Sequence, residues 1–390
     1  MAEAYIVAAT RTAGGRRKGR LAGWHPADLA AQVLNNLIDR TGADPALVED
    51  VIMGCVSQAG EQSNNIARGA VLASRFPESV PATSVDRQCG SSQQALHFAA
   101  QAVMSGTQDI VIAAGVESMT RVPMGTPVIL PAQAGLGTPM SSLQQARYPN
   151  IQFSQFMGAE MVAKKYGLTK DQLDEWSYQS HQKAIAATQA GAFRDEIVTI
   201  ETTDAAGAVS LHSVDEGIRF DASLDGIRGV KLLQEGGQLS AASSSQICDG
   251  ASGVMIVSAA GLRRLGVDPI ARIHHLTVIG GDPVIMLEAP IPATKRALAK
   301  AGLSIDDIDL FEVNEAFASV PVAWLKETGA DPARLNVNGG AIALGHPLGA
   351  SGTKLMATLV HALKARGKRY GLQTMCEGGG LANVTIVERL

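Results

Sequence analysis

Cys89 is the side chain in this sequence best placed to act as a nucleophile. It lies in the stretch VDRQCGSSQQAL, where a short apolar strand pattern at 82–85 gives way to Gly90 and then to a helical pattern at 93–104. A sulfur at a helix N-terminus faces unpaired backbone N–H groups and the positive end of the helix dipole, which lower the pKa of a thiol from about 8.5 towards neutrality. A thiolate attacks carbonyl carbon, whereas a buried cysteine more often packs as a small apolar residue. The stretch alone leaves both interpretations open.

Three further turns carry polar or reactive side chains next to glycine or at a strand end. They are His346 between Gly345 and Pro347, Cys376 before Glu377-Gly378-Gly379-Gly380, and Asn314-Glu315 after an apolar strand pattern. A histidine can take the proton of a thiol as a general base, and glycine N–H groups can bind an oxyanion. Taken singly, such a histidine is more often a surface or capping residue, and such a cysteine is more often inert. Because loops at the carboxyl ends of strands assemble active sites in α/β sheets, we expect these residues to converge.

Alternating strand and helix patterns must position these turns. Apolar runs suited to buried strands occur in both halves of the chain, at 5–9, 51–56, 82–85, 109–119, 253–259, 271–280 and 308–313. The alternation favours a layered α/β protein, and the second half repeats the order of strand, glycine turn and helix seen in the first. We also expect a helix that starts at Asn314, runs to Thr328 and is kinked at Pro321.

A long irregular segment interrupts this alternation. From Met119 to Gln155 the chain is rich in Pro, Gly, Gln and Met, and its prolines prevent long regular elements. Thr169 is then expected to cap a helix that runs to about Ala190. Because irregular segments of this length inside a compact protein are usually functional, we interpret 119–249 as an insertion.

Composition argues against several classes of protein. The 390 residues carry a net charge of −4, which provides no basic surface for nucleic acid, and no apolar run approaches the ~20 residues that span a bilayer. The first residues lack the basic and long apolar regions of a signal peptide, so we expect a cytoplasmic protein. Cys55, Cys89, Cys248 and Cys376 show no CxxC spacing, which disfavours a zinc site and structural disulfides. The absence of GxGxxG after a strand disfavours a dinucleotide enzyme.

The sequence resembles the thiolase family, the CoA-dependent acyltransferases that cleave or form 3-oxoacyl-CoA. The resemblance covers essentially the whole chain and is carried, in order, by RTAGG, DRQCGSSQQAL, GVESMTRVPMG, SSSQICDGA, NEAFA, NVNGGAIALGHPLGASG and CEGGG. It implies an α/β thiolase fold of two similar layered halves (αβαβα) with an inserted loop domain. The implied N-terminal half is 1–118 plus 250–270, the CoA-binding loop domain is 119–249, and the C-terminal half is 271–390.

The same resemblance implies a role for each reactive turn. Cys89 would carry the acyl group as a thioester and be activated by His346, while Cys376 would exchange protons with the substrate carbon or the CoA sulfur. Asn314 would hold a water that forms one oxyanion hole with His346, and the N–H groups of Cys89 and Gly378 would form the other. The implied reaction is thiolytic cleavage of 3-oxoacyl-CoA to acetyl-CoA and a shortened acyl-CoA, or the reverse condensation, as in fatty-acid β-oxidation.

Coenzyme A is a substrate in this scheme, and no metal or organic redox cofactor is implied. Ser245 matches the family's serine near the CoA pantetheine, Arg219 matches a nucleotide contact, and Met157 and Phe317 match residues close to the acyl chain. Each of the four is also interpretable as an ordinary loop, surface or core residue. Family members specialised for acetoacetyl-CoA often carry His-Met-Gly where this chain has Phe156-Met157-Gly158. The apolar ring favours a longer or bulkier acyl chain, from fatty-acid or sterol breakdown.

Two other functions stay open at this point. A decarboxylating condensing enzyme also uses a cysteine, but it would carry another histidine where this chain has Cys376. A non-catalytic acyl-CoA or lipid carrier with the same fold would form no covalent adduct, and the joint presence of Cys89, His346, Cys376 and Asn314 argues against it. By resemblance we expect a homodimer or homotetramer that acts on acyl-CoA and CoA, without nucleic acid or membrane partners.

Overall fold

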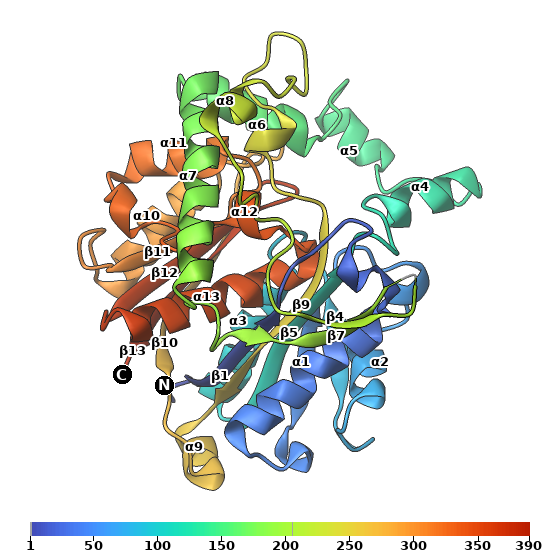
Figure 1. Cartoon of the computed structure of the whole chain (residues 1–390), viewed down its shortest axis with the longest axis vertical. Coiled ribbons are helices and arrows are strands. Elements are labelled where there is room, and N and C mark those ends of the chain that lie inside the picture. Colours follow the sequence, from blue (N-terminus) through green and yellow to red (C-terminus); the bar gives the residue numbers. More distant parts are fainter. Residues whose placement is uncertain (1, 205) are drawn as a thin grey trace.

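The computed structural model describes residues 2–204 and 206–390, which form an α/β protein built on one large mixed sheet (Figure 1). The principal strands are β1 Tyr5–Thr12, β3 Asp50–Gly54, β4 Ala82–Val85, β5 Ile110–Ser118, β9 Cys248–Val257, β10 Ala271–Gly280, β11 Leu310–Val313, β12 Tyr370–Glu377 and β13 Leu381–Arg389. Their order across the sheet is β11-β12-β13-β10-β1-β9-β5-β3-β4. Two short strands pair beside this path, β2 Gly15–Arg16 with β9 and β6 Ile197–Val198 with β1.

The sheet consists of two halves with the same topology. In the first half β3 and β5 are parallel, β5 and β9 are antiparallel, and β9 and β1 are antiparallel. In the second half β11 and β12 are parallel, β12 and β13 are antiparallel, and β13 and β10 are antiparallel. The halves meet where β1 pairs with β10 through Tyr5↔Arg272 and Ile6↔Ala271. The repeat suggested by the sequence is therefore present in the strand pairing.

Helices form three layers around the two halves of the sheet. The outer helices are α1 Pro26–Thr41 and α2 Ile66–Ala73 on the first half and α10 Pro290–Ala301 and α11 Ser319–Thr328 on the second, and the central helices are α3 Ser91–Ser105 and α13 Ser351–Ala365. On β9, Met255 and Val257 pack in the cluster that contains α1, whereas Val254 and Ile256 pack with α3 and α13. Both faces of the strand are covered, which explains its uninterrupted apolar sequence. The resulting order of layers is the expected αβαβα.

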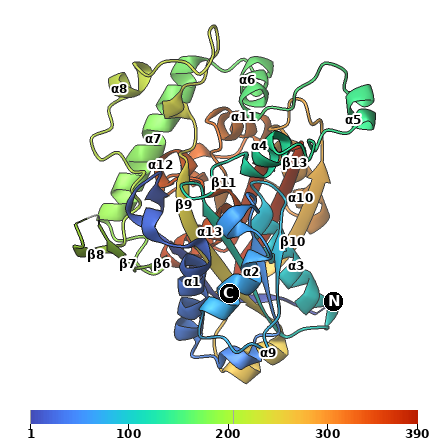
Figure 2. The same cartoon turned by 90° about the vertical axis from the view of Figure 1, so that its right-hand side faces the viewer.

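The segment between β5 and β9 forms the upper part of the molecule in Figures 1 and 2 with its helices, while its short strands lie lower, beside the first half of the sheet. Its elements are α4 Thr126–Gln133, α5 Ser142–Arg147, α6 Gln155–Lys165, α7 Lys170–Gln189, the hairpin of β7 Ile200–Thr203 and β8 Val209–His212, and α8 Leu224–Arg228. Thr169 caps α7 as predicted, through a reciprocal pair of hydrogen bonds with Gln172. Residues 124–147, here called the projecting segment, extend away from the body with α4 and α5. A membrane-spanning helix is not found among the described residues.

One predicted helix begins later than expected. Asn314 and Glu315 lie in an irregular stretch after β11, and α11 starts only at Ser319. The intervening backbone bonds to a distant loop instead, because the carbonyl of Ala316 accepts from the N–H of Ser245 at 2.9 Å. Pro321 is then the third residue of α11, where its missing N–H removes no intrahelical bond, so the predicted kink was wrong. Two short helices, α9 Ala259–Leu265 and α12 Ala341–Leu344, complete the chain.

Candidate active site

The three reactive residues of the predicted site are buried at the ends of different elements. Cys89 precedes α3, His346 lies in the turn between α12 and α13, and Cys376 is the second-to-last residue of β12. Their exposed fractions are 8%, 3% and 0%, respectively. Cys89 packs in one apolar cluster with Leu348, two residues after His346, and with Met375, the neighbour of Cys376. The structure therefore brings the three turns together.

The pKa of Cys89 lies above that of a free thiol. Burial raises this pKa to about 12, and the negative charge of Glu377 adds to the effect. The N–H groups of Cys89 itself and of Gly378 favour the thiolate but offset only part of the desolvation. The prediction of a helix-acidified thiol was therefore wrong, because burial outweighs the helix N-terminus, whose first N–H, that of Ser91, is already bonded to the carbonyl of Gln88 at 3.0 Å. Cys89 rests as a neutral thiol.

The same two N–H groups lie near the sulfur of Cys89, and their role as an oxyanion hole stays a prediction. The N–H groups of Cys89 and Gly378 both stabilise negative charge on Sγ. Gly379 and Gly380, which complete the turn, have φ of +83° and +78°, a backbone conformation that favours glycine. N–H groups beside the sulfur suit the oxygen of a carbonyl group that is attacked by Cys89.

Hydrogen bonds fix His346 as a neutral base with its lone pair on Nε2. Ser351 Oγ donates its only proton to the carbonyl of Pro347 at 3.0 Å, so it accepts from Nδ1 of His346, 2.5 Å away. Nδ1 then carries the imidazole proton, and Nε2 carries the lone pair that can accept one. Burial, and to a smaller extent the charge of Lys354, lowers the pKa of His346 to about 3. The ring is therefore uncharged at neutral pH and can act as a general base.

Asn314 lies beside this lone pair. Its Nδ2 is 3.3 Å from Nε2 of His346, and its backbone N–H donates to the carbonyl of Thr374 at 3.1 Å, which anchors it to β12. Its Oδ1 is buried and has no hydrogen-bond partner among the described residues. Because buried amide oxygens generally accept a hydrogen bond, this atom is available to a water or ligand next to Nε2. The arrangement is compatible with the predicted oxyanion hole, which stays a prediction.

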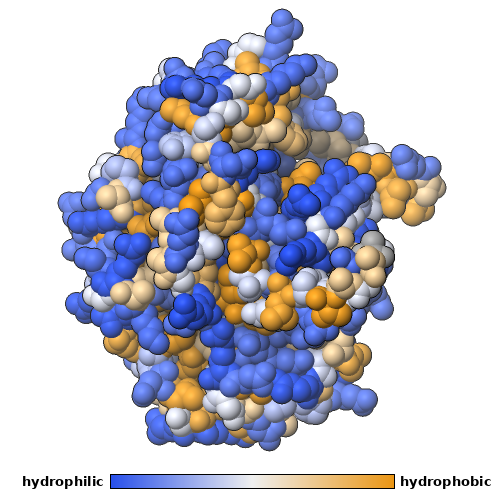
Figure 3. All heavy atoms as spheres, viewed as in Figure 1, coloured by the Kyte–Doolittle hydropathy of each residue, from blue (hydrophilic) through white to orange (hydrophobic). Residues whose placement is uncertain are grey.

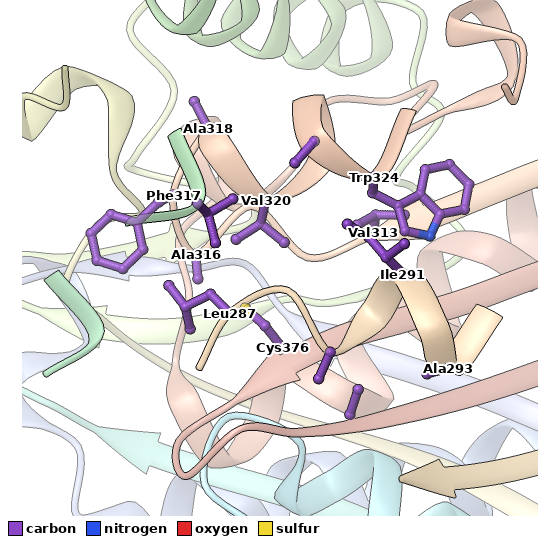
Figure 4. Packing of buried hydrophobic residues seen from close by; sticks show 14 of the residues in the cluster. Leu287, Ile291, Ala293, Val313, Ala316, Phe317, Ala318, Val320, Trp324 and Cys376 are labelled. Atoms are coloured by element: carbon purple, nitrogen blue, oxygen red, sulfur yellow. The ribbon is translucent and has the colours of Figure 1, made fainter. Parts of the chain in front are cut away.

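Cys376 lies in apolar surroundings near the end of β12. Figure 4 shows it beside the segment that carries Leu287, and it packs in the same cluster as Ala316 and Phe317. Burial raises the pKa of Cys376 well above that of a free thiol, and negative charge on Cys89 raises it further. The two sulfurs are thus close enough to affect each other, and the pair carries one negative charge more readily than two.

Two residues that hold His346 in place were not found by sequence analysis. Lys354 in α13 is buried, and its Nζ donates to the carbonyls of Leu344 and Gly345 at 2.6 and 2.7 Å, directly before His346. Its only sequence signal is a charge within the small and apolar residues of SGTKLMATL. Ser351, which fixes the imidazole tautomer, carries no signal beyond lying at the start of that helix.

Two adjoining cavities reach Cys89 and His346. The smaller, of about 360 Å³, is lined by His346 and by residues that include Ser245, Phe156 and Phe317. The larger, of about 820 Å³, is lined by Cys89, Gly378 and much of the projecting segment. They share the lining residues Met124, Gln155 and Leu348, so one ligand can extend from one cavity into the other past the reactive groups. Apolar side chains are exposed along the projecting segment, on the right of Figure 3.

Two of the four predicted CoA and acyl contacts line these cavities. Ser245 and Phe317 line the smaller one, and Phe317 packs edge to face with Phe156, with ring centroids 5.6 Å apart. Met157 is 55% exposed and lines neither cavity; its neighbour Phe156 faces the smaller one instead. Arg219 is exposed and also lines neither. All four contacts with substrate stay predictions.

Comparison with known sequences shows what the chain is similar to. The family described as "Thiolase, N-terminal domain" matches residues 4–260, and "Thiolase, C-terminal domain" matches residues 267–389. The chain is 52% identical to steroid 3-ketoacyl-CoA thiolase FadA6 of Mycobacterium tuberculosis, over 100% of this chain and 95% of that protein. It is 42% identical to a 3-ketoacyl-CoA thiolase of Pseudoalteromonas translucida, over 99% and 98% of the two chains. It is 41% identical to one of Yersinia pestis over the full length of both.

Proposed function

The chain belongs to the thiolase family, and from this premise we propose that it cleaves 3-oxoacyl-CoA with coenzyme A through an acyl thioester on Cys89. The products are acetyl-CoA and an acyl-CoA shortened by two carbons. The observation that carries the proposal is the convergence of three buried turns that carry Cys89, His346 and Cys376. A neutral thiol at Cys89, a neutral His346 with its lone pair on Nε2, and a second neutral thiol at Cys376 provide one base and one acid around a nucleophile.

In the first half-reaction, Sγ of Cys89 attacks the 3-oxo carbon while Nε2 of His346 takes the thiol proton. The raised pKa of Cys89 and the lowered pKa of His346 disfavour a standing thiolate and imidazolium, so proton transfer accompanies the attack. The new oxyanion is bound by the N–H groups of Cys89 and Gly378. The bond between C2 and C3 then breaks, and the electron pair left on C2 takes the proton of Cys376 to give acetyl-CoA.

In the second half-reaction, the acyl group passes from Cys89 to coenzyme A. The thiolate of Cys376 takes the proton of the CoA thiol, and the CoA sulfur attacks the thioester carbon. The same two N–H groups bind the oxyanion a second time. When the tetrahedral intermediate collapses, Cys89 leaves and recovers its proton from His346, so all three side chains regain their initial states. The reverse sequence of steps is the condensation.

The substrate we propose carries an acyl group longer or bulkier than acetoacetyl, which makes the activity an acetyl-CoA C-acyltransferase rather than an acetyltransferase. The cavity of about 820 Å³ beside Cys89 is lined by the apolar projecting segment and is large enough for a drug-sized group. Phe156 adds an apolar ring to the adjoining cavity, next to Phe317. The 52% identity to a steroid 3-ketoacyl-CoA thiolase supports a substrate derived from a sterol.

Intact-mass measurement tests the covalent step. Incubation with a 3-oxoacyl-CoA should add one acyl group to the chain, peptide mapping should locate it on Cys89, and added CoA should remove it. Cys89→Ala should show no adduct and a loss of thiolysis of about 10⁴-fold or more. Cys55→Ala is the matched control, because Cys55 is another buried thiol and lines neither cavity. Binding of acyl-CoA without any adduct would instead indicate a carrier.

Rates across acyl groups test the substrate. We expect the specificity constant kcat/KM to be larger for long-chain and ring-bearing 3-oxoacyl-CoA than for acetoacetyl-CoA. A kcat/KM for acetoacetyl-CoA far above all others would refute this part of the proposal and leave the acyl-enzyme chemistry intact. A decarboxylating condensing enzyme is not favoured, and release of carbon dioxide from malonyl-CoA would be its signature.

A further inference from the structure

The proposed reaction uses Cys376 and Gly378 but assigns no role to the residue between them, Glu377. Glu377 is the last residue of β12, and it is 0% exposed. Neither of its carboxyl oxygens has a hydrogen-bond partner among the described residues. Burial of an ionised carboxylate without a partner is strongly disfavoured, so a side chain in this position needs an explanation.

The carboxyl group of Glu377 lies directly against the loop that carries Cys89. A Cβ atom on Gly90 would come within 2.0 Å of Oε1, so only glycine leaves room for the carboxyl group at this point. The charged and titratable groups that act on it or on its neighbouring sulfurs are Arg87, Cys89, Cys376 and Glu117. Arg87 attracts the carboxylate but does not hydrogen-bond to it.

The first half of the protein provides an internal comparison. Glu117 is the second-to-last residue of β5, whose strand pairings correspond to those of β12, and it is also 0% exposed. Its oxygens accept hydrogen bonds at 2.8–3.0 Å from the N–H groups of Val56, Ser57 and Gly349 and from the side chain of Gln62. Gly349 lies two residues before α13, and Gly90 lies directly before α3, so the two glycines occupy similar places in the two halves. Glu117 thus ties loops together, whereas Glu377, in the corresponding place, makes none of these bonds.

Negative charge on Glu377 competes with negative charge on the two sulfurs. After burial, it is the strongest influence that raises the pKa of Cys89, and it also raises that of Cys376. Burial raises the pKa of Glu377 itself to about 8, and the charge of Arg87 and the nearby backbone N–H of Asn383 offset only part of this rise. The carboxyl group is therefore mostly protonated at neutral pH and ionises in the range where thiols become reactive. The three groups titrate as a coupled set that holds one negative charge more readily than two.

We propose that Glu377 is a positioning residue that controls the charge of the reacting sulfur, because its protonated carboxyl group permits negative charge on Cys89 and its ionised carboxylate opposes it. The proposal rests on the proposed function only in taking Cys89 as the reacting group. It explains why a buried carboxyl group that no side chain hydrogen-bonds is placed between Cys376 and Gly378.

The test is the rate at which iodoacetamide alkylates Cys89 between about pH 6 and pH 10, followed by peptide mass. No CoA substrate is needed, so the result does not depend on turnover. Glu377→Gln removes the charge and keeps the shape of the side chain. Glu377→Met also removes the charge but introduces no amide, so it serves as the second variant if the buried amide of glutamine disturbs folding. The matched control is Glu312→Gln. Glu312 is another buried glutamate whose pKa burial raises, but its charged neighbours are Glu315, Glu196, Lys183 and Lys354.

At about pH 6 the parent and both Glu377 variants should react within about twofold of each other, because the parent carboxyl group is then protonated. At about pH 9 the variants should react about tenfold faster, which is the factor that one pKa unit of Cys89 gives. Glu312→Gln should follow the parent. The proposal would be overturned if the alkylation rates of the parent and both Glu377 variants rose with pH in the same way. It would also be overturned if the variants reacted faster by the same factor at every pH, including pH 6, because that result would indicate a structural change. Absence of an acyl adduct on Cys89 would reject the proposed function separately.

Discussion

Replacement of Ser351 by alanine should slow acyl transfer without unfolding the protein, because Ser351 determines which nitrogen of His346 carries the proton. Ser351 Oγ accepts from Nδ1 of His346 and donates to the carbonyl of Pro347. Alanine leaves Nδ1–H as a buried donor without a partner, which costs about 1–3 kcal/mol. Moving the proton to Nε2 relieves this cost, but it removes the lone pair that takes the proton of Cys89.

The size of the effect follows from that penalty. At about 1.4 kcal/mol per factor of ten, the cost corresponds to a fall in kcat of roughly 5- to 150-fold. KM for the acyl-CoA should change by less than about threefold, since Ser351 lines neither of the two substrate cavities. Steady-state thiolysis gives both constants, and the rate of Cys89 acylation in the absence of CoA isolates the step in which His346 acts as base.

Ser319→Ala is the matched control for this experiment. Ser319 is also 0% exposed, but its hydroxyl has no hydrogen-bond partner among the described residues, so its removal strands no donor or acceptor. Its kcat should equal that of the parent. If Ser351→Ala retained a kcat within twofold of the parent while its thermal unfolding was unchanged, the assignment of the imidazole proton to Nδ1 would be refuted.

Two further substitutions test the substrate cavity and the buried charges. Phe156→His places a polar ring against Phe317, and it should lower kcat/KM for long acyl chains relative to acetoacetyl-CoA by roughly tenfold; an unchanged ratio would contradict the role of the apolar ring. Arg11→Met should destabilise the fold by about 3–5 kcal/mol at pH 7 in urea unfolding, because it strands the buried carboxylates of Glu196 and Asp215, which lie 2.6 and 2.7 Å from the guanidinium. Although burial alone would raise it, the pKa of Asp215 is lowered in the folded state by Arg11 and Lys354. Its contribution is therefore complete above the unfolded pKa of about 3.9 and is lost as pH falls further, so the difference between parent and variant should shrink below about pH 4. A difference that stayed constant with pH would contradict this account.

The position of the reactive residues was predictable because it depends on local sequence. Glycine-containing turns mark the ends of regular elements, and Cys89, His346 and Cys376 each lie next to such a glycine or are separated from it by one residue, after β4, after α12 and at the end of β12, respectively. The charge state of Cys89 was not predictable in this way. It depends on burial by Leu348 and Met375, which come from the other half of the chain, and on the charge of Glu377. Local sequence suggested that the pKa of Cys89 is lowered. Burial by residues distant in the sequence raises it instead.

The late start of α11 has the same kind of cause. Residues 314–318 are compatible with a helix when they are considered alone, and the apolar pattern continues through them. In the folded chain the N–H of Ala318 donates to the carbonyl of Ser243, and the carbonyl of Ala316 accepts from the N–H of Ser245. These bonds to the insertion hold Asn314 in an irregular stretch, where its amide reaches Nε2 of His346. A helix that began at Asn314 would form i to i+4 bonds in place of these.

The repeat of the fold accounts for the meeting of the nucleophile and the base. Each half contributes one central helix, α3 or α13, and the two helices pack against each other between the halves of the sheet. Cys89 lies two residues before α3 and His346 lies five residues before α13. Two copies of one structural unit thus place a thiol and an imidazole in the loops that lead into the two central helices, and the antiparallel pairing of β1 with β10 brings the two halves together. The two halves differ at the ends of β5 and β12. Glu117 in β5 accepts several hydrogen bonds, whereas Glu377 in β12, next to Cys376, has no hydrogen-bond partner among the described residues. In one half the glutamate anchors loops, and in the other we propose that its charge acts on the reacting sulfurs.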